Sequence, residues 1–191
     1  MQVNPAVEAA PAYPFLRIAE LRERALAIDP GLIDLSIGQP TDPAPAIVRD
    51  ALMAAAATVP LSPYPPAAGL PALREAIAAW AARRHGVLLD PDRELLPTLG
   101  SKEPIAQVAR LFAAPGDAIA VTSPGYPVPE RSARMAGLRI HQLVLRERDG
   151  WLPDPDAIPW GDVAVVWIAT PHNPTGAIAA PELLAELAER C

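Results

Sequence analysis

Residues 115–128, PGDAIAVTSPGYPV, decide the fold. The apolar run from Ala118 to Thr122 has the length of a buried strand, and Pro124 and Gly125 end it in a rigid turn. The pattern returns at residues 163–176, VAVVWIATPHNPTG, where an apolar run leads into a loop with two prolines and a glycine. Apolar strands that each end in a fixed polar loop are typical of an α/β protein with a parallel sheet.

Around these two runs, strand patterns alternate with helix patterns. We expect strands at 95–99, 118–122, 138–145 and 163–170, helices that end near Phe112 and Met135, and a last helix that begins at Pro181. Every position from Val163 to Ile168 is apolar, which predicts a central strand covered on both faces. The predicted class is therefore α/β, with helices on both faces of the sheet.

Before residue 95 the pattern is helical. We expect a first helix from Pro14 through Phe15, Ile18 and Leu21. A second helix should have Pro43 and Pro45 in its first turn and run to about Ala57. The third should be amphipathic, opened by Gly69 and ended by Gly86, with Leu73, Ile77 and Trp80 on one face. A short apolar stretch, Leu32 to Ile37, lies between the first two.

Composition narrows the classes of function. The 191 residues are 51% hydrophobic and 20% charged, which predicts a globular chain with a core. A net charge of -6 argues against a nucleic-acid or anionic membrane partner, so we expect a small-molecule ligand. No apolar run reaches the ~18–20 residues of a membrane span. With no signal-like start and one cysteine, Cys191, the expected location is the cytoplasm.

The three histidines carry no predicted chemistry. His85 falls at the end of a predicted helix, His141 falls within a strand, and His172 falls in the loop after residues 163–170. Their spacing matches no metal site. We therefore expect structural roles for all three and no metal site.

Three short loops are candidates for binding. Gly100, Ser101 and Lys102 open a helix, whose first N–H groups lack helical partners and suit a phosphate, although an ordinary strand-to-helix turn would look the same. Tyr126 and Asn173 each follow a predicted strand. Parallel strands gather such loops at one edge of the sheet, where open α/β folds bind ligands. The extra glycines of the dinucleotide-binding and Walker motifs are absent.

Five segments together resemble class I and II aminotransferases of the fold-type-I pyridoxal-phosphate family. They are LSIGQPTDPAP (35–45), YPPAAGLPALREAIAAW (64–80), TLGSKE (98–103), PGDAIAVTSPGYPV (115–128) and ATPHNPTGAI (169–178). Their order and spacing match, and the resemblance covers nearly the whole chain. It implies an incomplete large-domain sheet together with the N-terminal part of a small domain.

The resemblance also implies roles for single residues. Asn173 corresponds to the asparagine that hydrogen-bonds the phenolic oxygen of pyridoxal 5'-phosphate, and Tyr126 to the aromatic residue that stacks on its ring. Gly100, Ser101 and Lys102 correspond to the residues whose backbone amides hold the phosphate. These assignments agree with the loop positions derived above.

Two further residues resemble family positions outside these loops. Tyr64 corresponds to the tyrosine that reaches the phosphate of the partner subunit's cofactor, which implies a homodimer in the full-length parent, although a surface aromatic is the plain alternative. Gly38 corresponds to a glycine over the substrate carboxylate. We expect an N-terminal arm and part of the small domain at 1–42, and the first half of the large domain at 43–191.

The family's catalytic lysine has no counterpart in this sequence. Members hold the cofactor as a Schiff base to a lysine that lies well after the HNPTG loop. The chain has one lysine, Lys102, and its motif places it at the phosphate end of the cofactor. We therefore predict an inactive fragment that binds the cofactor weakly, with a truncated gene product, one half of a split protein and a non-catalytic remnant as the alternatives.

Within the family, three segments point to a subfamily. YPFLRIAELRERA (13–25), LSIGQPTDPAP (35–45) and ELLPTLGSKEPIA (94–106) resemble succinyldiaminopimelate aminotransferases of lysine biosynthesis, which use glutamate as amino donor. Aspartate- or alanine-type aminotransferases and a pyridoxal-phosphate lyase of the same fold remain alternatives, because their front halves share these motifs.

Overall fold

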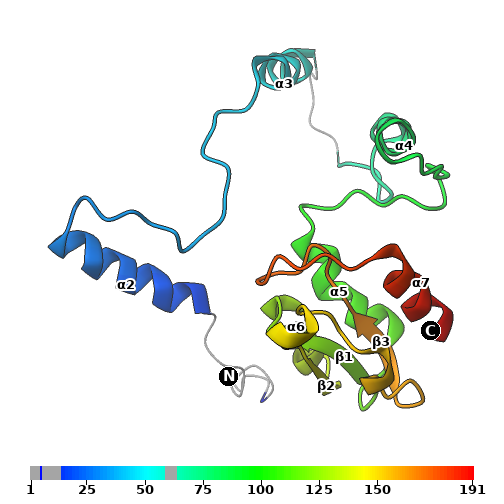
Figure 1. Ribbon diagram of the computed structural model, residues 1–191. Coiled ribbons are helices and arrows are strands. Elements are labelled where there is room, and N and C mark those ends of the chain that lie inside the picture. Colours follow the sequence, from blue (N-terminus) through cyan, green and yellow to red (C-terminus); the bar gives the residue numbers. More distant parts are fainter. Residues whose placement is uncertain (1–4, 6–13, 59–63) are drawn as a thin grey trace. The chain divides into compact units, whose positions relative to one another are not determined.

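The computed structural model describes residues 5, 14–58 and 64–191 (Figure 1). Contacts divide the chain into two compact units. We call Ala12–Pro97 the helical unit and Thr98–Cys191 the sheet unit, and each is described by itself. The expected domain boundary between residues 42 and 43 concerns the complete fold, and it stays a prediction.

The helical unit contains three described helices. They are α2 (Pro14–Ile28), α3 (Ala46–Thr58) and α4 (Pro71–His85). All three predicted helices are thus confirmed, but α3 begins after Pro45, so neither Pro43 nor Pro45 lies in its first turn. Leu32 to Ile37 is irregular.

The ends of α4 follow the sequence signals. Gly86 ends the helix in the left-handed conformation at φ 69°, which glycine adopts without strain. Gly69 also has a positive φ of 79° in the turn before the helix, and its N–H donates to the carbonyl of Pro66. The expected apolar face is only half covered, since Leu73 and Trp80 are 46% and 54% exposed.

The sheet unit alternates helices and strands. Its elements are α5 (Lys102–Phe112), β1 (Ala118–Ser123), α6 (Pro127–Met135), β2 (Arg139–Val144), the 3-10 turns η1 (Glu147–Asp149) and η2 (Pro155–Ala157), β3 (Val163–Trp167) and α7 (Pro181–Arg190). The strand order is β2-β1-β3, and both pairings are parallel. The predicted parallel α/β architecture is confirmed.

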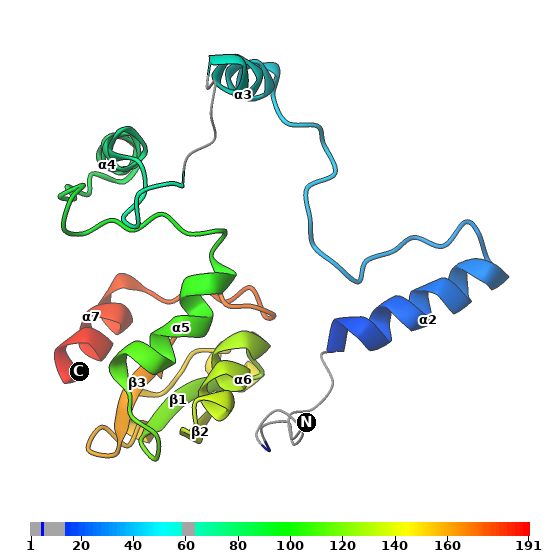
Figure 2. The ribbon, with the colours of Figure 1, turned by 180° about the vertical axis from the view of Figure 1, so that it is seen from behind.

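Alternate residues of β1 supply two cores. Ile119 and Val121 pack with Ala109 of α5 and Ala133 of α6 on one face. On the other face Ala120 packs in a cluster that includes Leu143, Ile158 and Leu187 of α7. Figure 2 shows α6 and α7 on opposite sides of the strands. The expectation of helices on both faces is therefore confirmed.

Two strand predictions need correction. Residues 95–99 are irregular, because Pro97 has no N–H for a sheet ladder and no described strand pairs with this segment. The central strand of the described sheet is β1, whereas β3 lies at an edge. Side chains of β3 do pack into both cores, as predicted from its apolar sequence.

Candidate functional site

Two polar loops meet at the carboxyl edge of the sheet. The β1 turn, residues 124–126, follows β1, and the β3 loop, residues 171–176, lies beyond β3. The strands are parallel neighbours, so both loops lie at the same edge. The chain leaves β1 for β2 on one side and returns to β3 on the other, which makes the β1/β3 boundary the topological switch point. Ligands of open α/β sheets bind at such points.

The β1 turn holds Tyr126 close to the strand. A Cβ atom at Gly125 would lie 2.2 Å from the carbonyl oxygen of Thr122, so the turn requires glycine. Tyr126 has extended backbone angles, φ -66° and ψ 128°, and is the N-cap of α6. Its side chain is half-buried. The ring is therefore carried by a short link between a buried strand and a helix.

The β3 loop is closed by its own backbone. The N–H of His172 donates to the carbonyl of Ala177, and the N–H of Gly176 donates to the carbonyl of His172, both at 2.7 Å. Gly176 takes a positive φ of 76°, which suits a glycine. Asn173 lies within this closed loop and is exposed. The loop thus presents the amide of Asn173 from a fixed backbone.

A buried histidine joins the two loops. His172 is 5% exposed, and its Nε2 lies 3.1 Å from Oγ1 of Thr122, the residue two positions before the β1 turn. Its Nδ1 lies 2.8 Å from Oγ1 of Thr175 within the β3 loop. Burial lowers the pKa of His172 below the usual value of 6.5, which favours the neutral ring.

Sequence reasoning assigned His172 a structural role and missed this link. The two partners that meet across the strand ends are 50 residues apart. Periodicity gives no signal for such a pairing. The available clue was that both segments follow apolar strands, since parallel neighbours bring the ends of their strands together.

The Gly100 turn leads into α5 at the same edge of the sheet. Helix α5 ends just before the start of β1, so its first turn lies toward the strands' carboxyl ends, as Figure 1 shows. Gly100 has a positive φ of 75°, and Ser101 is an N-cap whose side chain makes no cap hydrogen bond. The N–H of Ile105 donates to the carbonyl of Ser101, so the backbone N–H groups at 101–103 precede the helical ladder.

Tyr64 and Gly38 belong to the helical unit. Tyr64 is 99% exposed, and a Cβ at Gly38 would meet no described atom within 4 Å. Neither observation tests the role that the family resemblance implies. Both roles stay predictions.

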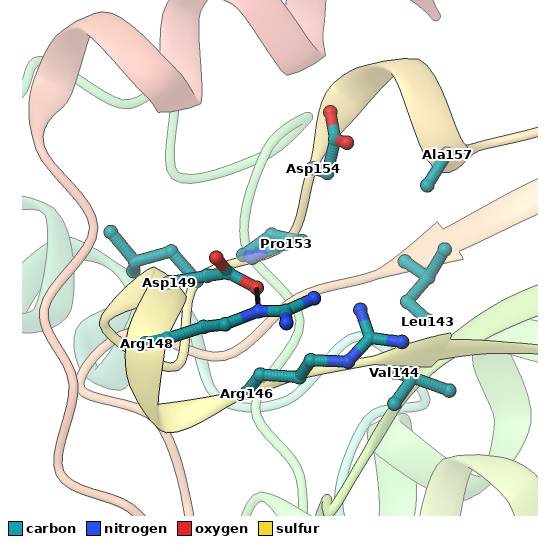
Figure 3. Close-up of a pocket in the computed structure, with 9 residues that line it drawn as sticks. Leu143, Val144, Arg146, Arg148, Asp149, Pro153, Asp154 and Ala157 are labelled. Carbon is teal, nitrogen blue, oxygen red and sulfur yellow. Dashed lines mark ion pairs between the residues drawn. The ribbon is translucent and has the colours of Figure 1, made fainter.

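One cavity of the sheet unit lies away from these loops. It has a volume of about 480 Å³ beside the end of β2, and Figure 3 shows Arg146 and Arg148 extending into it near Leu143 and Val144. Nε of Arg148 lies 3.7 Å from Oδ2 of the neighbouring Asp149. The residues that line it include none of the predicted cofactor residues. We therefore place the candidate site at the β1/β3 boundary, where the loop chemistry converges.

Comparison with known proteins identifies the family. The model of the family "Aminotransferase class I and II" matches residues 30–191. The chain belongs to the class I and II aminotransferases, as the sequence motifs predicted, and its sheet unit carries the corresponding α/β fold.

Individual relatives agree with this assignment. The chain is 38% identical to the LL-diaminopimelate aminotransferase of Dehalococcoides mccartyi over 99% of its own length and 50% of that protein. It is 41% identical to the enzyme of the same name from Moorella thermoacetica, over 99% of this chain and 49% of that protein. The chain thus spans about half the length of the curated relatives it matches.

Solved structures show the same coverage. The match to substrate-bound BacF from Bacillus subtilis covers 100% of this chain and 49% of the BacF chain, at a TM-score of 0.91 and 28% sequence identity. The match to aspartate aminotransferase from Thermus thermophilus with maleate covers 100% of this chain and 50% of that enzyme's chain, at a TM-score of 0.87 and 29% sequence identity.

The relatives correct one expectation. The relatives described above are LL-diaminopimelate aminotransferases and not the succinyldiaminopimelate type that the sequence segments suggested.

Class I and II aminotransferases use pyridoxal 5'-phosphate, and the sheet unit offers suitable donors. A phosphate dianion needs several N–H donors at close range, and the backbone N–H groups at 101–103 supply them beside Gly100, which carries no side chain. An aromatic ring and a carboxamide stand on the neighbouring loops. The chemistry of this donor set therefore fits the cofactor.

No described helix has the length and apolar character needed to cross a membrane. This finding concerns residues 14–58 and 64–191, in which all the helices named above lie.

Proposed function

We propose that this chain is the cofactor-binding front half of a pyridoxal-phosphate-dependent aminotransferase. The observation that carries the proposal is the hydrogen bond between His172 and Thr122, because it joins the β1 turn and the β3 loop at the topological switch point. Because members of this family use pyridoxal 5'-phosphate, it is the cofactor in this proposal. The site residues are carried over from the family motifs.

Each residue has one task in this proposal. The Gly100 turn binds the phosphate through the backbone amides of Ser101 and Lys102, and the half-buried ring of Tyr126 packs on the face of the cofactor ring. Asn173 donates its amide N–H to the phenolic oxygen. The bound cofactor supplies an electron-withdrawing ring that stabilises negative charge at the substrate α-carbon.

The proposed substrate is an α,α′-diamino dicarboxylic acid of the diaminopimelate type. The names of the relatives from Dehalococcoides mccartyi and Moorella thermoacetica support it, at 38% and 41% identity. The proposed co-substrate pair is glutamate and its keto acid. We further propose a cytoplasmic homodimer in which Tyr64 reaches the partner's cofactor phosphate and Gly38 lies over the substrate carboxylate.

This chain by itself is proposed to bind the cofactor without catalysis. Members of this family use the lysine that holds the cofactor as the acid and base at the α-carbon, and the only lysine here is Lys102. Its motif and its position in the first turn of α5 support a place at the phosphate end of the cofactor.

The experiment begins with the coding sequence after codon 191. An in-frame continuation with an Asp-x-x-Tyr element and then a Ser-x-x-Lys element supports a longer enzyme, whereas a stop codon favours the remnant. The product of the whole reading frame is then assayed for amino transfer to 2-oxoglutarate from LL-diaminopimelate, N-succinyl-LL-diaminopimelate and aspartate. Amino transfer from LL-diaminopimelate supports the proposed substrate. Preference for either other donor, or elimination without transfer, contradicts it.

A further inference from the structure

We infer that His172 is a positioning residue, a clamp that holds the β3 loop with Asn173 in place against the β1 turn with Tyr126. Its relevance to the cofactor rests on the proposed function. The clamp itself rests on geometry alone, namely two ring contacts at 3.1 and 2.8 Å from a side chain that is 5% exposed.

The two threonine partners suit a neutral imidazole. A neutral ring has one N–H donor and one bare nitrogen acceptor, and a hydroxyl can serve as partner to either. Thr122 and Thr175 therefore satisfy both nitrogens in either tautomer. A hydrogen bond buried in this way stabilises the arrangement mainly because breaking it leaves a buried polar atom unpaired.

The two contacts have different consequences. The contact with Thr175 stays within the β3 loop, where the hydroxyl also accepts the N–H of Ala177 at 3.3 Å. The contact with Thr122 connects that loop to another strand. Only the second contact sets where Asn173 lies relative to Tyr126.

Two conservative substitutions separate these contacts. In His172→Gln the amide group extends to about the position of Nε2, so it keeps the bond to Thr122. In His172→Asn the shorter amide corresponds to Nδ1 and keeps only the bond to Thr175. Thr122→Val removes the same link from the other side without changing the side-chain shape. His141→Asn is the matched control, because Nε2 of His141 lies 3.3 Å from the carbonyl oxygen of Ala157, away from both loops.

The first readout is amide hydrogen exchange of the full chain without ligand. We expect Thr122→Val and His172→Asn to speed exchange at Gly176 and Ala177 by about tenfold, the effect of one lost buried hydrogen bond. His172→Gln and His141→Asn should leave these rates within about twofold of wild type. Unchanged exchange in Thr122→Val would overturn the clamp.

The second readout compares pyridoxal 5'-phosphate with inorganic phosphate as ligands of the full chain. Loss of the clamp misplaces the ring contacts and leaves the Gly100 turn intact, so His172→Asn should weaken the cofactor about tenfold and phosphate less than about twofold. Rescue of cofactor affinity in His172→Gln supports positioning. Equal weakening of both ligands means general destabilisation and overturns it. If the wild-type chain binds neither ligand, the proposed function fails, and hydrogen exchange alone decides the clamp.

Discussion

Arg139 and Asp162 form a two-point ion pair at the amino edge of the sheet. Nη1 and Nη2 of the guanidinium lie 3.0 and 2.7 Å from the two carboxylate oxygens, and Nε donates to the carbonyl of Gly116 at 3.0 Å. Arg139 begins β2 and Asp162 directly precedes β3. The pair therefore links the two outer strands across the start of β1, at the edge opposite the candidate site.

Asp162→Asn should lower stability in a pH-dependent way. The hydrogen bond from Arg139 lowers the pKa of the Asp162 carboxyl below 3.8, so its contribution is complete above that value and is lost as pH falls through the lower folded pKa. Denaturant unfolding of both chains from about pH 6 to about pH 2 measures this. The difference in unfolding free energy between wild type and Asp162→Asn should vanish at the acid end of this range. Cofactor affinity at neutral pH should be the same in both chains. A difference that persists at the acid end would contradict this.

Sequence reasoning predicted the parallel α/β class and the loops because both depend on local patterns. The apolar runs at 118–122 and 163–168 and the glycines at 86 and 125 specify strands and turns through their own chemistry. The strand expected at 95–99 failed for a local reason, the missing N–H of Pro97, and because no described strand pairs with it, which a local pattern does not reveal. The pairing of His172 with Thr122 was missed for this second reason, since it joins residues 50 apart.

Gly125→Ala should disrupt the β1 turn. The added Cβ would lie 2.2 Å from the backbone oxygen of Thr122, and a backbone atom at the end of a buried strand cannot move without cost. We expect a loss of about 1–3 kcal/mol in unfolding free energy. Gly161→Ala is the matched control, because its Cβ would meet no described atom within 4 Å.

Denaturant unfolding of both variants measures the difference. The control should stay within about 0.5 kcal/mol of wild type. Equal effects at the two glycines would show that the close approach to Thr122 does not exist in solution.

Arg74→Met should loosen the turn before α4 in the helical unit. Arg74 is 8% exposed, and its guanidinium donates to the carbonyls of Pro91, Ala68 and Gly69 at 2.7, 3.1 and 2.7 Å and to Asp92 at 2.6 Å. Removing a charged donor from these hydrogen bonds costs about 1.5–3 kcal/mol. Arg74→Lys should restore only part of the lost stability, since an ammonium group lacks the planar, forked donor arrangement of a guanidinium.

Hydrogen exchange at Gly69, whose N–H donates to the carbonyl of Pro66, measures the effect of Arg74 substitutions locally. Arg83→Met, an exposed arginine in the same helix, is the control and should leave the rate unchanged. Slow exchange at Gly69 in Arg74→Met would contradict the prediction.

The stability that His172 contributes should decline in acid. Burial is the cause of its lowered pKa, so the unfolded chain binds the proton at a higher pH than the folded chain. The contribution is complete above about 6.5 and is lost as pH falls toward the folded pKa. His172→Gln cannot titrate and lacks this dependence.

Unfolding free energies of wild type and His172→Gln between about pH 7.5 and about pH 5 measure this dependence. As the pH falls, the unfolding free energy of wild type should decrease relative to that of His172→Gln. A constant difference over this range would mean that His172 is not buried as described.

Titration of the full chain with pyridoxal 5'-phosphate, followed by borohydride reduction and mass spectrometry, tests the cofactor half-site most directly. We predict weak, saturable, reversible binding at one site per chain, which Asn173→Ala and Tyr126→Ala weaken further, with no stoichiometric adduct after reduction. The absence of saturable binding, or a stoichiometric borohydride-fixed adduct on Lys102, would contradict the half-site.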